Sequence, residues 1–241
     1  MLDLLSVELK KLRRRRLILL LPLTSLALPS ITFFYFYKHD TYLTDMGLYK
    51  QAIFSFNIFF ILPVILGVFA TVLVCSEYHY TTIKQLWLIP VGKVKLIFAK
   101  WITVLIMSML FMAVSEVFTF VFGGIFHFLE FEPEALLFVI LKGAQASVIE
   151  AIAIFPILAV AALHHNYLMP CCATIIYTFI GFIFASVNPY LLPSASAIFC
   201  IAHDFPNVIY PHEYNAIFTF LCFFVWTVAS LICVQRGLSE R

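Results

Sequence analysis

Residues 52–75 read AIFSFNIFFILPVILGVFATVLVC, and residues 76–100 read SEYHYTTIKQLWLIPVGKVKLIFAK. The first stretch holds no charged side chain, and as a helix rising about 1.5 Å per residue it can cross a hydrocarbon core of about 30 Å. The second stretch is polar and leads into another apolar run that begins at residue 101. This alternation recurs along the chain and predicts an all-α polytopic membrane protein.

The composition agrees with that fold class. Of the 241 residues, 63% are hydrophobic and 12% are charged, and the mean hydropathy is +1.02, whereas soluble domains carry about 25% charged residues. The apolar runs leave little chain for an extramembrane domain, so we expect residues 1–241 to form a single transmembrane domain. The net charge of +2 gives no reason to expect nucleic acid as a partner.

Six apolar runs have the roughly 20 residues that a span requires. They predict transmembrane helices at 17–37, 52–75, 101–123, 135–162, 167–187 and 215–234. The fourth run contains Lys142, Glu150 and Pro156, so we expect it to be broken near Gly143 or Pro156. Six spans place both termini on one side. Most Lys and Arg residues fall on that side, which the positive-inside rule assigns to the cytoplasm.

Two segments outside the spans are expected near the membrane surface. Residues 1–16 carry leucines at spacings of three and four and end in a basic cluster, which predicts an amphipathic helix on the inner leaflet. A signal peptide is not expected, because the following run 17–37 has the length of a span and no cleavage site follows. Residues 188–214 are rich in proline around an apolar core too short to span, which predicts short helices, interfacial or re-entrant, at the outer face.

The polar stretch 76–100 has more pattern than a simple connector. Its marked positions are Glu77, Thr82, Lys84, Leu86, Pro90 and Lys100. Together with the basic surface helix, the six spans and the long outer segment, this order resembles the ABC-2 type permeases, the membrane subunits of certain ATP-binding-cassette exporters. The spacing within the stretch is similar to permeases of lantibiotic and bacitracin immunity systems. Ile83 stands where that group often has Trp, and Trp87 lies nearby.

The resemblance implies a mechanical role for residues 76–100. They would form the coupling helix, which lies in a groove of a separate ATPase subunit and transmits its rigid-body motion to the spans. The apolar anchors and the register-setting lysines would be Leu86, Trp87, Ile89, Lys84 and Lys93. The alternative is an ordinary cytoplasmic loop whose lysines face lipid phosphates.

No nucleotide site is expected on this chain. Gly92–Lys93 superficially matches the end of a phosphate-binding loop, but the upstream glycine is missing and Val94 replaces the magnesium-binding hydroxyl. ATP and Mg²⁺ would therefore bind the partner subunit. The resemblance implies a bacterial plasma membrane protein that assembles with a second permease copy, or a related permease, over two ATPases.

Three charged residues are expected inside the spans. Glu116, Lys142 and Glu150 are costly in lipid and should face protein or water. Counting residues from the span ends puts Glu116 and Lys142 at nearly the same depth, so we hypothesise that they pair near the outer leaflet. A role of these side chains in substrate contact or proton relay is the alternative. Glu150 either lines a cavity or is buried as a neutral structural group.

A metal site is not expected. His164, His165, Cys171 and Cys172 have no standard zinc-ligand spacing, and the histidines are better explained as a polar turn between two spans. We interpret the cysteines of the chain as small buried apolar side chains.

The sequence thus favours an exporter permease without an active site of its own. The resemblance implies an amphipathic substrate, a lantibiotic or other peptide antibiotic, that is moved from the membrane to the outside. An ion- or proton-coupled secondary transporter using Glu116, Lys142 and Glu150 is the main alternative, although no inverted repeat supports it. An intramembrane hydrolase would need His partners for the two glutamates at helical spacing, and the spans lack them.

Overall fold

The structure is a computed structural model, and it describes residues 2–14, 21–39, 47, 49–79, 93–125, 133–164, 166–205 and 213–239. Within these ranges all elements are helical. In chain order they are α1 (Leu2–Arg14), η1 (Leu21–Leu26), α3 (Ala27–His39), η2 (Lys50–Phe54), η3 (Asn57–Ile61), α5 (Leu62–His79), α7 (Lys93–Ile125), α8 (Pro133–Ala153), α9 (Phe155–Leu163), α10 (Leu168–Val187), α11 (Pro193–Ala202) and α12 (Ala216–Ser239).

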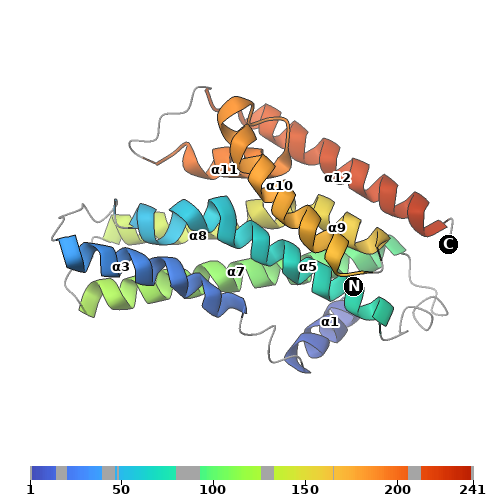
Figure 1. The fold of residues 1–241 in the computed structure, drawn as a ribbon, viewed down its shortest axis with the longest axis horizontal. Coiled ribbons are helices and arrows are strands. Elements are labelled where there is room, and N and C mark those ends of the chain that lie inside the picture. The colour runs from blue at the N-terminus through green and yellow to red at the C-terminus, as the bar shows by residue number, and fades with distance from the viewer. Residues whose placement is uncertain are drawn as a thin grey trace.

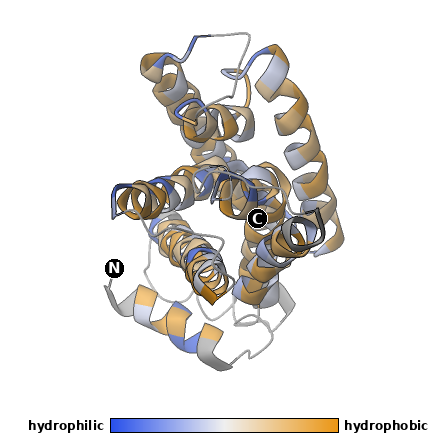
Figure 2. Ribbon diagram, turned by 90° about the vertical axis from the view of Figure 1, so that its left-hand side faces the viewer, coloured by the Kyte–Doolittle hydropathy of each residue, from blue (hydrophilic) through white to orange (hydrophobic). Residues whose placement is uncertain are grey.

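The long helices run side by side in one bundle (Figure 1). Their residues are mostly apolar, whereas α1 alternates polar and apolar residues (Figure 2). Five stretches among the described residues are long and apolar enough to cross a membrane. They are Lys50–Ser76, Lys95–Ile125, Pro133–Leu163, Leu168–Val187 and Ala216–Arg236. These five confirm the predicted second to sixth spans. The predicted first span corresponds to a shorter apolar helical stretch, Leu21–Tyr35, so the count of six stays a prediction.

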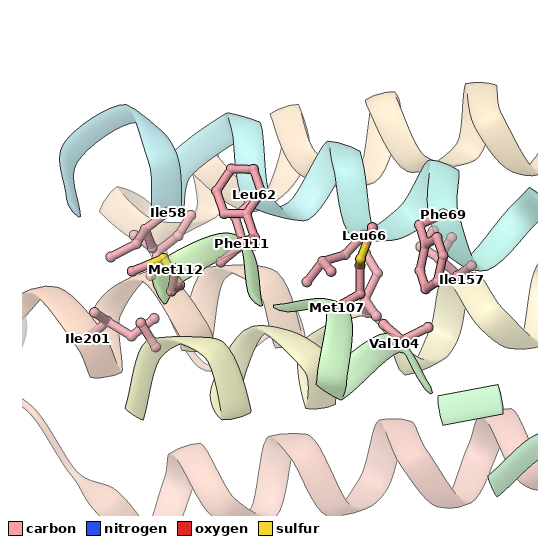
Figure 3. Packing of buried hydrophobic residues seen from close by; sticks show 14 of the residues in the cluster. Ile58, Leu62, Leu66, Phe69, Val104, Met107, Phe111, Met112, Ile157 and Ile201 are labelled. Carbon is pink, nitrogen blue, oxygen red and sulfur yellow. The ribbon is translucent and has the colours of Figure 1, made fainter. Parts of the chain in front are cut away.

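The core lies where α5 meets its neighbours. Leu62, Leu66 and Phe69 of α5 are fully buried and face side chains of α7, α9 and α11 (Figure 3). Large apolar residues here, such as Phe111, are held between helices rather than exposed to lipid. This packing makes α5, with the π-helical turns η2 and η3 before it, the central span of the bundle.

Small residues allow two of these helices to approach their neighbours closely. A β-carbon on Gly67 of α5 would overlap the side chain of Thr174 of α10, and one on Gly181 of α10 would overlap Ser194 of α11. Such contacts between small residues stabilise helix pairs in a membrane, where the hydrophobic effect does not drive them together.

The fourth span is broken at Ile154, between α8 and α9, which confirms the predicted break near Pro156. Pro156 has no N–H to donate, and the amide of Ile157 bonds to the Ile154 carbonyl instead of continuing the α-helical pattern. The carbonyl of Ala153 accepts the hydroxyl of Tyr177 on α10 at 2.7 Å. A side chain from another span therefore satisfies the backbone at the break.

A short helix precedes the last span as predicted, but it does not lie on the surface. All ten residues of α11 are buried, and α11 packs against α8, α10 and α12. Whether this segment is interfacial or re-entrant stays a prediction. The stretch that proline and length prevented from spanning is instead folded into the bundle.

Candidate functional site

Following the predicted orientation, we call the end of the bundle where α1 lies the inner end and the opposite end the outer end. An ionic cluster joins α1 to the core at the inner end. Glu8 of α1 is buried, and its carboxylate Oε1 lies 3.0 Å from Lys11 Nζ and 3.6 Å from Lys100 Nζ. Lys100 Nζ also donates to the Leu73 carbonyl of α5 at 3.2 Å. The helices α1, α5 and α7 are therefore fastened together close to the ends that carry the predicted coupling stretch.

Both ends of the predicted coupling stretch, residues 76–100, belong to helices that continue into the spans. The helix α5 continues to His79, and α7 already begins at Lys93, so Glu77 lies near the end of one helix and Lys93 at the start of the other. The residues between them that we expect to meet an ATPase lie outside the described residues. They are Thr82, Lys84, Leu86, Trp87 and Pro90.

The prediction that Lys100 belongs to the coupling loop has to be corrected, because Lys100 lies within α7. Its side chain is 2% exposed and is bound by α1 and α5. It is therefore not available for direct contact with an ATPase, and it holds α1 to α5 and α7. A residue count along the chain could not reveal that α1 covers it.

The predicted ion pair between Glu116 and Lys142 is wrong. Lys142 of α8 pairs with Asp204, which follows α11. Glu116 of α7 lies against the neighbouring Gly143, where a β-carbon would overlap its carboxylate. The predicted depth was therefore right, but the lysine turns to a carboxylate in the outer segment that depth counting along the spans did not consider.

Asp204 belongs to a polar group at the outer end, the end opposite α1, that sequence reasoning missed. His203 Nε2 lies 2.7 Å from Asp204 Oδ1, and the His203 ring stacks on Tyr214 with centroids 3.8 Å apart. The Tyr214 hydroxyl lies 3.2 Å from Cys200 Sγ, and burial raises its pKa to about 12. The signal available in the sequence was an acidic residue at the end of a short apolar helix.

Glu150 is deeper in the bundle and fully enclosed. Its side chain is 1% exposed, and its Oε1 accepts no hydrogen bond from any described residue. It precedes the break at Ile154 by one helical turn, and the Ile154 amide donates to its backbone carbonyl at 3.0 Å. Both interpretations of Glu150, as a cavity-lining group and as a neutral structural group, stay predictions.

An open apolar groove of about 390 Å³ lies between η1 and α7. Its lining consists of Leu26, Leu110, Ala113, Val114, Val117, Phe118 and Val121. Among the described residues no three His, Cys, Asp or Glu side chains gather as a metal site would require. The described residues therefore provide an apolar groove and ionic contacts that connect the helices, and the groove lining contains no catalytic group.

Comparison with known proteins agrees with this arrangement. Residues 4–181 match the family model described as ABC-2 family transporter protein. The chain belongs to the ABC-2 transporter family. It is also similar to the bacitracin transport permease protein BCRB of Bacillus licheniformis, with 31% identity over 157 residues, which are 63% of this chain and 73% of the relative.

For this ABC-2 permease, the match begins inside α1, at residue 4, and ends inside α10, at residue 181. The ionic cluster around Glu8 and the intramembrane residues Glu116, Lys142 and Glu150 lie within it. Asp204 lies beyond it. The permease is thus a multi-pass transport subunit, and its outer contact between α8 and α11 joins the matched region to a segment outside the match.

Proposed function

We propose that this permease is the membrane subunit of an exporter that a separate ATPase drives, and that it moves an amphipathic peptide antibiotic out of the membrane. The similarity to a bacitracin transport permease is the observation that carries this proposal. Two permease chains, identical or related, would stand over two ATPase subunits with both termini in the cytoplasm. ATP and Mg²⁺ would bind the ATPase.

The ionic cluster at Glu8 supports a mechanical link to the ATPase. A motion that enters between α5 and α7 can move the bundle only if these helix ends are stiffly connected. Lys100 bonds to Glu8 of α1 and to the carbonyl of Leu73 of α5. Force applied to residues 80–92 would therefore reach α1, α5 and α7 together.

The groove between η1 and α7 suits the apolar part of an amphipathic substrate. Its lining is entirely apolar and its mouth is open, as a route from the membrane would require. Aromatic side chains near it could add contact area. Phe118 lines the groove.

The coupling assignment is tested by co-purification of the tagged permease with its ATPase. Leu86→Asp or Trp87→Asp should reduce the recovered ATPase at least about tenfold, because a charge in the centre of a docking surface removes an apolar anchor. Gln85→Asp adds the same charge at a polar neighbour and should leave the recovery unchanged. Undiminished recovery with both anchor variants would refute the coupling role of the stretch.

A second candidate, a proton- or ion-coupled transporter, is favoured by two buried carboxylates. Glu116 and Glu150 each have an oxygen that accepts no hydrogen bond from the described residues, and such groups in spans often relay protons. Proteoliposomes that contain the permease without an ATPase separate the two functions. Substrate movement driven by a proton gradient alone would favour the second candidate over the exporter.

A further inference from the structure

The ion pair between Lys142 and Asp204 joins α8 to the end of α11. Its two partners differ in their surroundings, because the lysine side chain is 8% exposed and the aspartate side chain is 42% exposed. Asp204 can therefore lose its partner and remain hydrated. Lys142 cannot, since a cation left alone within a span is strongly disfavoured.

A second carboxylate lies close to the same lysine. Glu116 Oε1 is buried, accepts no hydrogen bond from any described residue, and lies where a β-carbon of Gly143 would be. Neighbouring Cα atoms are about 3.8 Å apart, which puts this oxygen within roughly 7 Å of the Cα of Lys142. The flexible four-carbon stem of a lysine covers about that distance.

Polar contacts hold the two ends of α11 to different helices. At its start, the Ser194 amide donates to the Tyr177 hydroxyl of α10 at 3.1 Å. Just after its end, Asp204 holds Lys142 of α8. Breaking the second tie would leave the first in place, so α11 could swing away from α8 while it stays attached to α10.

We propose that Lys142 is a latch with two positions at the outer end of the permease. In the first position it binds Asp204 and holds α11 against α8, which keeps the outer side closed. In the second position α11 has moved away and Lys142 binds Glu116. This proposal rests on the proposed export function, because an exporter has to open its outer side to release its substrate.

Cys200 is a built-in reporter of the position of α11. It lies one helical turn before Asp204 and is 7% exposed, so movement of α11 away from α8 should uncover its thiol. Burial raises the pKa of this thiol, and the charge of Lys142 lowers it whereas that of Asp204 raises it. Removing the charge of Asp204 would therefore lower the pKa of the thiol and speed its labelling, and removing the charge of Lys142 would raise the pKa and slow labelling. Opening of the latch would speed labelling in both cases.

The first test measures how fast a hydrophilic maleimide labels Cys200. It uses the purified full-length permease in lipid nanodiscs, with the other cysteines replaced by alanine and with neither ATPase nor substrate. Asp204→Asn and Lys142→Met should each raise the rate at least about tenfold, since each removes the ion pair that holds α11 to α8. Glu134→Gln, an exposed acid on α8, is the control and should leave the rate unchanged. Faster labelling in Asp204→Asn with slower labelling in Lys142→Met is the electrostatic result and would overturn the latch.

The second test asks whether Glu116 is the other position. If Asp204→Asn lets Lys142 turn to Glu116, this variant should stay folded, and so should Glu116→Gln. The double variant leaves the lysine alone, so its apparent melting temperature should fall by more than the two single decreases together. Additive decreases would overturn the second position. Neither test involves an ATPase, so either can fail while the proposed export function stands.

Discussion

Glu8 binds one exposed lysine and one buried lysine, and this difference predicts how much each lysine contributes to the free energy of unfolding. Lys11 is 42% exposed and Lys100 is 2% exposed. Lys100→Met should lower the free energy of unfolding by about 2 kcal/mol, less than for an isolated buried pair because Lys11 still compensates Glu8. Thermal melting of the purified permease measures this loss of stability. Lys95→Met removes an exposed lysine of the same helix and should cost little; equal losses in both variants would contradict the role given to Lys100.

Gly143 is the residue that lets Glu116 fit between α7 and α8. A β-carbon there would overlap the carboxylate, so Gly143→Ala should destabilise the permease by about 1–3 kcal/mol, as overpacking does. Glu116→Ala removes the overlapping group, and in that background Gly143→Ala should cost almost nothing in the same melting assay. Ala144 is exposed, and Ala144→Val should be tolerated. A full loss that persists without Glu116 would contradict the proposed contact.

At the scale of elements, the break between α8 and α9 depends on one hydroxyl. Tyr177 donates to the Ala153 carbonyl at 2.7 Å and accepts the Ser194 amide at 3.1 Å. Tyr177→Phe leaves both backbone groups unpaired inside the bundle and should cost about 2–3 kcal/mol. Tyr190 bridges the backbones of Glu213 and Asn215 in the same way at an exposed site. There water can replace the hydroxyl, so Tyr190→Phe should lower the free energy of unfolding by less than about 1 kcal/mol. Similar losses from both would contradict the argument.

The sequence predicts these elements because a bilayer fixes their length and proline fixes their breaks. Hydropathy alone located the second to sixth spans, and Pro156 located the kink, since a missing N–H acts locally. The position of α11 could not be predicted in this way. Its length excludes a span, but only packing against α8, α10 and α12 decides between the surface and the interior.

The same distinction applies to the candidate site. Residue counting gave the depth of Lys142 correctly, because the rise of a helix is constant. It could not give the direction in which the side chain points, nor the carboxylate of Asp204 that the fold brings beside it. Lys100 was likewise assigned to a loop, because the sequence does not show that α1 folds back onto α7.

In the whole molecule, the two ionic contacts lie far apart along the bundle and act on different helices. The cluster at Glu8 joins α1, α5 and α7 at the inner end, and Lys142 joins α8 to the end of α11 at the outer end. Figure 1 shows α1 and the C-terminus toward one end, with α11 displaced toward the other. A motion that begins at an ATPase would have to cross the packed core of α5 and α7 to reach α11.

This separation predicts that assembly and transport can be lost independently. Leu86→Asp should abolish both co-purification of the ATPase and resistance to the exported antibiotic, because no force enters the bundle. Lys142→Met should leave the recovered ATPase unchanged and still remove most of the resistance, since the outer latch is broken while the inner contacts stay intact. Antibiotic survival curves and ATPase recovery from the same cells measure the two effects, with Glu134→Gln as the control that keeps both. Loss of ATPase binding in Lys142→Met would show that the outer contact supports the inner surface, and full resistance would show that transport does not depend on the latch.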